Sequence, residues 1–196
     1  MATAGVERVQ SAAIVLTGGQ STRMGTDKAT LIVNGTSMLD RVLDQLDQAG
    51  VTPVAVAGSD DVPDEEIGQG PMAGIVSGWR YLQTRSELQS VSFDPVLVLS
   101  CDLPRLDATV IAALISQAPK HEHGAVAHDG RRPQPLIAAY RPKALDRVDA
   151  AYKTGQRSVR RASAGWDLGV VSVPAALLAD ADRPQDLKGF DVQWPH

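Results

Sequence analysis

The sequence lacks the features that mark extracellular, membrane-spanning and nucleic-acid-binding proteins. Cys101 is the only cysteine among 196 residues, so an intramolecular disulfide is excluded and a reducing compartment is favoured. The 19 Lys and Arg residues do not outnumber the 23 Asp and Glu residues, and a net charge of -4 gives no overall basic surface for a nucleic-acid polymer. Residues 1–10 are mixed and charged, unlike a secretory signal, and no later window reaches the length of a membrane span without charge. We expect a cytoplasmic protein that binds neither a membrane nor a nucleic-acid polymer.

Repeats and low-complexity tracts are also missing. The content of 43% hydrophobic and 21% charged residues is ordinary for a soluble globular protein. A chain of this length is sufficient for one substantial hydrophobic core. We therefore expect a single domain spanning residues 1–196.

The chain does have a compact anion-binding stretch near its start, in residues 13–31. A short apolar run ends at Leu16 and is followed by Thr17-Gly18-Gly19, which is typical of a buried strand that leads into a turn. The paired glycines allow backbone N–H groups to approach a phosphate closely. Arg23 adds a planar set of donors and Lys28 adds a compact positive charge. Together these groups suit a triphosphate.

Two common phosphate-binding motifs do not fit this stretch. A Walker A loop needs Gly-Lys-Ser/Thr in succession, but Thr26 and Asp27 separate Gly25 from Lys28. A dinucleotide fingerprint needs G-x-G-x-x-G, which Gly18-Gly19 followed by Gly25 does not supply. Both interpretations are therefore rejected.

Apolar strands alternate with amphipathic helices along the next hundred residues. The pattern predicts strands over residues 53–57 and 95–102, and helices over residues 37–48, from Pro71, and from about Asp107. Strand-helix-strand units of this kind place ligands at the carboxyl ends of parallel strands. Asp102 ends the most apolar strand, so its carboxylate is a candidate Mg²⁺ ligand. Asp102 could instead cap the following helix, although Asp107 is better placed to do so.

The second half of the chain departs from this regular alternation. Residues 124–128 and 136–140 predict two strands of a hairpin with Asp129-Gly130 at its turn, which indicates a mixed sheet. A further strand is expected over residues 169–173, with helices before it. His121-Glu122-His123 resembles a metal cluster, but the segment has no second pair of ligands, and we interpret it as a solvated loop.

Residues 16–28 match the pattern L-x-G-G-x-S-x-R-M-G-x-D-K, which resembles the signature of sugar-nucleotide-type nucleotidyltransferases. Its molybdenum cofactor guanylyltransferase branch is the most similar. The resemblance implies a three-layer α/β/α Rossmann-like fold with a mixed, mostly parallel sheet. It also implies that Arg23, Lys28 and Asp102 are catalytic, that Asp102 holds the metal through a Cys-Asp-x-Pro tetrad, and that the nucleotide-binding residues are Leu16, Thr17, Gly18, Gly19, Ser21, Arg23, Lys28, Asp64, Gly74 and Asp102.

The roles of Asp64 and Asp182 and the choice of nucleotide base leave alternatives open. Asp64 precedes a Gly-Pro-x-x-Gly element that ends at Gly74, as in the family, but Asp64 could equally be one of several acids on a solvated loop. Asp182 matches a terminal D-x-D element and is a possible second metal ligand, or the N-cap of a short helix. The family commonly has an asparagine near the end of its second strand, where this chain has Ala57, so the choice between GTP and CTP stays open.

The resemblance also indicates residues for the second substrate, the phosphate of a pterin. Gln134 and Pro135, next to Arg131 and Arg132, occupy the family's pocket segment, and Arg157 matches Gly-x-Arg-x-Val. An exposed turn and ordinary surface arginines are the alternatives. Arginine is suited to phosphate because its donors are planar and paired.

The implied activity is transfer of GMP from GTP to molybdopterin or Mo-molybdopterin, with Mg²⁺, giving a guanine dinucleotide and pyrophosphate. A cofactor-delivery protein or a molybdoenzyme is a possible partner. The alternatives are a molybdopterin cytidylyltransferase, another small nucleotidyltransferase, or a non-catalytic nucleotide-binding module, which would bind GTP without releasing pyrophosphate.

Overall fold

The computed structural model describes residues 8–17, 28–62 and 70–193. The predictions for Gly18, Gly19, Ser21, Arg23 and Asp64 lie outside these residues. No helix within the described residues has the length and apolar composition needed to cross a bilayer.

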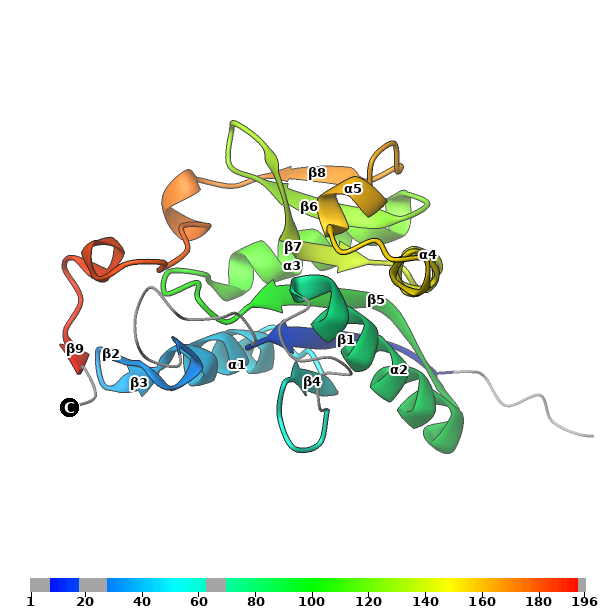
Figure 1. Cartoon of the computed structure of the whole chain (residues 1–196), viewed down its shortest axis with the longest axis horizontal. Coiled ribbons are helices and arrows are strands. Elements are labelled where there is room, and N and C mark those ends of the chain that lie inside the picture. Colours follow the sequence, from blue (N-terminus) through cyan, green and yellow to red (C-terminus); the bar gives the residue numbers. More distant parts are fainter. Residues whose placement is uncertain (1–7, 18–27, 63–69, 194–196) are drawn as a thin grey trace, which may run out of the picture.

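A six-stranded mixed sheet forms the centre of the molecule, with the strand order β4-β1-β5-β7-β6-β8 (Figure 1). The strands β1, β4 and β5 are parallel to one another, whereas β7 runs antiparallel to both of its neighbours, β5 and β6. This confirms the predicted mixed, mostly parallel sheet. The strand bounds are β1 Arg8–Leu16, β4 Val54–Ala57, β5 Val91–Ser100, β6 Gly124–His128, β7 Pro133–Tyr140 and β8 Gly169–Ser172.

Helices cover both faces of this sheet, as predicted for a three-layer α/β/α fold. Ile14 points to the face covered by α2, α4 and α5, whereas Val15 points to the face covered by α1 and α3, since successive side chains of a strand alternate. Each face therefore has its own apolar core. The helix bounds are α1 Met38–Gln48, α2 Pro71–Gln89, α3 Ala108–Gln117, α4 Pro142–Lys153 and α5 Val159–Ala162.

A second, small sheet joins residues 32–37 to the end of the described chain. It has the order β3-β2-β9, with β3 at Thr36–Ser37, β2 at Ile32–Val33 and β9 at Val192–Gln193. A small core that includes Leu31, Val33 and Leu187 lies beside it. Short 3-10 helices complete the fold at Lys28–Thr30, Ala118–Lys120, Ala175–Leu177 and Pro184–Leu187. The pairing of β2 with β9 was not predicted, because strands of two residues have no readable periodicity.

The predicted helix and strand positions are largely confirmed, with differences at their ends; β7 begins at Pro133 and β5 ends at Ser100, two residues before Asp102. The helix α1 begins at Met38, and Ser37 Oγ caps it by accepting from Asp40 N at 3.0 Å. The strands β1 and β5 begin earlier than predicted, because Arg8 and Gln10 pair with Val91 and Phe93. Polar residues on these strand starts concealed them in the sequence.

The prediction of a solvated loop at residues 121–123 is wrong for His123. His123 is only 4% exposed, and its ring stacks on the Trp166 ring with the two centroids 5.1 Å apart. His123 Nδ1 accepts from Asp167 N at 3.3 Å. The aromatic partner lies more than forty positions away in the sequence, so the local pattern gave no sign of it.

Candidate active site

The candidate active site lies at the carboxyl ends of β1, β4 and β5. Leu16 pairs with Ala57 of β4 on one side and with Ser100 of β5 on the other. Thr17 Oγ1 donates to Ala57 O at 2.6 Å, and Cys101 N donates to Leu16 O at 3.0 Å. The backbone just after each strand is therefore held in place, so Thr17 and Asp102 start from adjacent strand ends.

Lys28 joins Asp102 to a third segment, near the end of the described chain. Its Nζ donates to Asp102 Oδ2 at 3.2 Å and to Asp182 Oδ1 at 2.5 Å. The side chains of Lys28 and Asp102 are only 16% and 17% exposed, whereas that of Asp182 is 47% exposed. The structure thus brings together the predicted catalytic lysine and both predicted metal ligands.

The charges of this group alter two pKa values. Burial lowers the pKa of Lys28, but the hydrogen bond to Asp182 and the charge of Asp102 outweigh burial, so the pKa is raised and the ammonium form is favoured. Burial, followed by the charges of Asp182 and Asp102, raises the pKa of Asp180. Asp180 is therefore a third carboxyl group close to this site. We did not single it out from the sequence, although it is the other acid of the D-x-D element.

Asp102 is fixed on both its side chain and its backbone. Ser100 Oγ donates to Asp102 Oδ1, and Asp102 O accepts from Ala181 N at 2.9 Å. The helix cap that was an alternative role for Asp102 belongs to Asp107, which accepts from Thr109 N at 3.0 Å and Val110 N at 3.1 Å. The carboxylate of Asp102 is consequently left to face Lys28.

The alternative role of Asp182 as an N-cap is wrong. Arg183 holds the cap position of the 3-10 helix Pro184–Leu187. The carboxylate of Asp186 accepts from Asp182 N at 3.1 Å and from Arg183 N at 2.8 Å. The Asp182 carboxylate instead accepts from Lys28 Nζ at 2.5 Å.

Gly74 lies in the first turns of α2, close behind the helix start. Gly70 precedes the helix with a φ of 81°, and Pro71 is its first residue, where its missing N–H costs no hydrogen bond. Gly74 itself is buried. The structure thus places Gly74 inside the packed part of α2, just after the helix start.

The predicted second-substrate residues lie outside the ion-paired group of Lys28, Asp102 and Asp182. Gln134 and Pro135 lie near the start of β7, at the sheet edge where β5 ends, because the two strands are antiparallel. Gln134 Nε2 donates to Asp129 Oδ2 at 2.7 Å, and Pro135 O accepts from Tyr140 Oη at 2.9 Å.

Arg157 lies in the connection between α4 and α5. It donates to Tyr152 O at 2.9 Å, and its Cζ lies 4.1 Å from the centroid of the Tyr152 ring.

The hairpin turn before β7 is held by Asp129, whose Oδ1 accepts from Arg131 N at 2.7 Å and Arg132 N at 2.8 Å.

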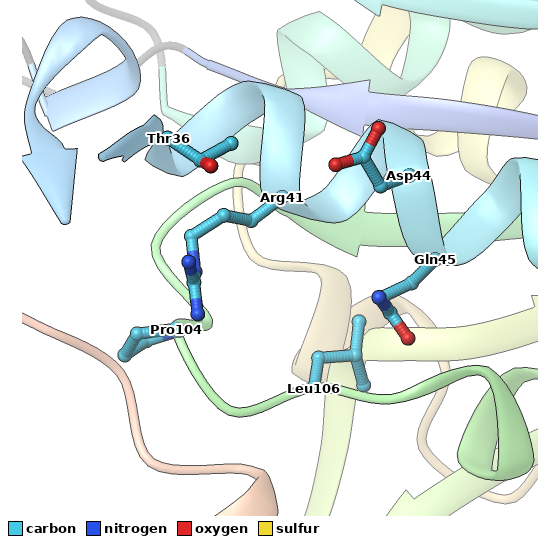
Figure 2. A pocket seen from close by; sticks show the side chains of 6 residues that line it. All are labelled: Thr36, Arg41, Asp44, Gln45, Pro104 and Leu106. Atoms are coloured by element: carbon cyan, nitrogen blue, oxygen red, sulfur yellow. The ribbon is translucent and has the colours of Figure 1, made fainter. Parts of the chain in front are cut away.

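A small polar hollow lies between α1 and the loop that carries Pro104 and Leu106 (Figure 2). Its volume of about 120 Å³ is below the size typical of drug-sized ligands. Arg41 Nη1 donates to Val33 O at 3.1 Å, and Gln45 Oε1 accepts from Ala108 N at 2.9 Å. The hollow thus lies beside the hydrogen bonds that join α1 to β2 and to α3. It is lined by Thr36, Arg41, Asp44, Gln45, Pro104 and Leu106.

The donor set at Lys28 fits a magnesium ion that also binds substrate phosphates. Two carboxylates converge on a single cation, the Lys28 ammonium. Magnesium is commonly bound by one or two carboxylates, with phosphates and waters completing its ligands. Within the described residues no group of three or more His, Cys, Asp or Glu side chains could hold a metal ion. A cage made of protein ligands alone is therefore not seen there.

Comparison with known proteins places this arrangement in a family. A model of the MobA-like NTP transferase domain matches residues 13–167. A probable molybdenum cofactor guanylyltransferase from Nostoc sp. is 31% identical, over 89% of this chain and 87% of the relative. A crystal structure of molybdopterin-guanine dinucleotide biosynthesis protein A from Archaeoglobus fulgidus has a TM-score of 0.69 at 21% identity, over 91% of this chain and 95% of that chain.

The Mycobacterium tuberculosis protein Rv0371C, solved in complex with manganese, has a TM-score of 0.63 at 15% identity, over 90% of this chain and 95% of that chain. These structural neighbours share the three-layer α/β/α fold described above. The family model goes further, because its match over residues 13–167 includes Leu16, Ala57 and Asp102. The chain therefore belongs to the MobA-like NTP transferase family.

Proposed function

We propose that this chain transfers GMP from GTP to molybdopterin or Mo-molybdopterin, forming the guanine dinucleotide form of the cofactor and releasing pyrophosphate. The observation that carries the proposal is the convergence of Lys28, Asp102 and Asp182 at the carboxyl ends of β1 and β5. Family membership and the guanylyltransferase relative support the same reaction.

The reaction needs no nucleophile from the protein. A phosphate monoester oxygen of the pterin would form a bond to the α-phosphorus of GTP. The bond from that phosphorus to the oxygen that bridges the α- and β-phosphates would break, and its electron pair would leave with pyrophosphate. Lys28 would turn from its carboxylates to the departing phosphates and offset their developing charge. Holding both substrates in line supplies the remainder of the catalysis.

Asp102 and Asp182 are the residues that would hold Mg²⁺. When bound, the ion supplies neutralisation of phosphate charge. Asp102 is the better anchored of the two, since Ser100 and Ala181 fix its side chain and its backbone.

The glycine-rich stretch supplies the nucleotide contacts in this proposal. Gly18, Gly19, Ser21 and Arg23 would bind the phosphates together with Leu16 and Thr17, on the strength of the sequence pattern. Asp64 and Gly74 would lie near the base and ribose. Gln134, Pro135 and Arg157 would bind the pterin phosphate, with Arg157 released from Tyr152 O to do so.

The partners follow from this chemistry. GTP and the pterin are the substrates, and a delivery protein or a molybdoenzyme is the proposed recipient of the product. The single cysteine and the acidic net charge are consistent with a cytoplasmic enzyme that acts without a membrane or a nucleic-acid polymer.

Pyrophosphate release separates this function from its alternatives. We would measure release from GTP and from CTP in the presence of Mg²⁺ and molybdopterin, for the wild-type chain and for Asp102→Ala. The proposal predicts release from GTP that is lost in the variant. Release from CTP alone would indicate a cytidylyltransferase. Nucleotide binding without release from either, with a competent acceptor, would indicate a binding module.

A further inference from the structure

A contact between Arg105 and Phe190 connects the two segments that carry the candidate metal ligands. The Arg105 Cζ lies 4.4 Å from the centroid of the Phe190 ring, a cation–π geometry. Arg105 follows Asp102 by three positions, in the loop between β5 and α3. Phe190 follows Asp182 by eight positions, in the segment that leads to β9. Both residues are partly buried.

This last segment, residues 180–193, is anchored at two ends. At its start, Ala181 N donates to Asp102 O at 2.9 Å. At its end, Val192 pairs with Val33, and Asn34 N donates to Asp191 O at 2.6 Å. Phe190 lies between these anchors and packs against the small core of Leu31, Val33, Met38, Ala181 and Leu187.

The spacing of Asp102 and Asp182 needs such an anchor. In the structure, Lys28 bridges the two carboxylates. If Lys28 turns to the phosphates of the nucleotide, that bridge is lost while the carboxylates have to stay close enough to share a cation. The remaining contacts that tie residues 180–193 directly to the Asp102 loop include the Ala181 hydrogen bond and the Arg105–Phe190 stack.

We infer that Arg105 and Phe190 are positioning residues that hold Asp182 against Asp102 and so set the affinity of this carboxylate pair for a divalent cation. The inference rests on the proposed function in its assignment of the two aspartates as metal ligands. Neither residue touches the reacting atoms. Their effect passes through the backbone of the two segments.

The two partners can be altered without emptying the small core. Phe190→Leu keeps apolar volume but removes the aromatic face, and Arg105→Met keeps an apolar stem but removes the charge. Phe190→Tyr keeps the face. A second pair provides a matched control, because Arg85 Cζ lies 5.7 Å from the Tyr81 ring centroid on α2, away from the site.

The experiment titrates Mn²⁺ into the full chain by calorimetry, for the wild type and for each variant. Arg105→Met and Phe190→Leu are expected to weaken Mn²⁺ binding by about three- to tenfold, the range that loss of one such contact gives. Phe190→Tyr and Arg85→Met are expected to bind Mn²⁺ like the wild type. Wild-type affinity in both Arg105→Met and Phe190→Leu, or equal weakening in Arg85→Met, would overturn the inference.

Amide exchange at Ala181 gives a readout that does not depend on metal. The inference predicts faster exchange of this N–H in Arg105→Met and Phe190→Leu, and unchanged exchange in Arg85→Met. If Asp102→Asn leaves Mn²⁺ affinity unaltered, the metal assignment of the proposed function is wrong, whereas faster Ala181 exchange would still support the positioning contact. Unchanged exchange in both variants would overturn the contact itself.

Discussion

Lys28 Nζ lies 2.5 Å from Asp182 Oδ1, although 154 positions separate the two residues in the sequence. The pairing makes the end of the chain part of the same site as the stretch near its start. Asp182 lies beyond residue 167, where the match to the family model ends. Residues 180–193 thus contribute a carboxylate that pairs with Lys28, as well as β9 of the small sheet.

The two aspartates should differ in importance. Asp102 is 17% exposed and fixed by Ser100 and Ala181, whereas the Asp182 side chain is 47% exposed. We expect Asp102→Asn to lower the rate of GMP transfer by about 100-fold or more, and Asp182→Asn by about tenfold. Steady-state rates at saturating Mg²⁺ and GTP test this order. A larger loss in Asp182→Asn than in Asp102→Asn would contradict it.

Lys28 should oppose metal binding while it supports transfer. Its ammonium lies between the two carboxylates, so a cation must compete with it there. We expect Lys28→Met to bind Mn²⁺ about three- to tenfold more tightly without nucleotide, because one positive charge has been removed. Turnover should nevertheless fall by about 100-fold or more, since the leaving phosphates lose a donor.

Calorimetry and steady-state assays on the same preparation separate these two effects of Lys28. Lys28→Arg is the control that keeps the charge, and it should bind Mn²⁺ like the wild type. Weaker Mn²⁺ binding in Lys28→Met would show that Lys28 holds the carboxylates in place and does not compete with the metal.

The ion pair between α2 and α4 predicts a pH dependence of stability. Arg80 Nη2 and Lys153 Nζ lie 2.6 Å and 2.5 Å from the carboxylate of Asp149. Burial raises the pKa of Asp149, but the hydrogen bonds from Lys153 and Arg80 outweigh burial and hold the pKa below its usual value of 3.8. When folding lowers the pKa of a carboxyl group, the ionised group stabilises the folded chain at any pH above its pKa in the unfolded chain. This stability is lost as the pH falls through its pKa in the folded chain.

We therefore expect Asp149→Asn to lower the free energy of unfolding by about 1 kcal/mol at pH 7, since the Lys153 partner is well exposed. The difference from the wild type should shrink as the pH falls below about 4. Urea unfolding across this range is the measurement. A difference that stays constant down to pH 3 would show that the effect comes from packing and not from charge.

Because α2 packs closely on β1, a methyl group added at Gly78 should lower the stability of the fold. A Cβ added at Gly78 would lie 2.6 Å from Ile14 Cγ2, which is closer than such atoms approach. We expect Gly78→Ala to destabilise the fold by about 1–2 kcal/mol, because overpacking exceeds the gain in helix propensity.

Ile14→Ala provides the matching half of a double-mutant cycle for this contact. The double variant should be more stable than the sum of the single changes predicts, by about 1 kcal/mol. Urea unfolding of all four chains gives the coupling. A Gly78→Ala variant as stable as the wild type, or a coupling of zero, would contradict the close contact.

The sequence predicted the main sheet and the position of Asp102 because their signals are local. The apolar runs that end at Leu16 and Ala57, and the run before Asp102, are each followed by turn or polar residues, and parallel strands bring such ends to one edge. The hairpin turn at Asp129 was predicted for the same reason, since Asp-Gly between two strands is a local pattern.

The features that were missed depend on distant partners. β2 pairs with β9 across most of the chain, and neither strand exceeds two residues. The burial of His123 depends on Trp166, and the contact of Asp182 with Lys28 joins residues 154 positions apart. Such choices are decided by tertiary contacts that no short window of sequence contains.

The central claim is GMP transfer to the pterin, and the identity of the labelled product tests it most directly. We would incubate the chain with Mg²⁺, molybdopterin and GTP labelled at the α-phosphorus, and identify the labelled species by chromatography and mass spectrometry. GMP transfer would put the label in a guanine dinucleotide of the pterin, with an equal amount of pyrophosphate, and neither product would form with Asp102→Ala. Label that stays in GTP, with an acceptor shown to be competent, or an equal yield from Asp102→Ala, would contradict it.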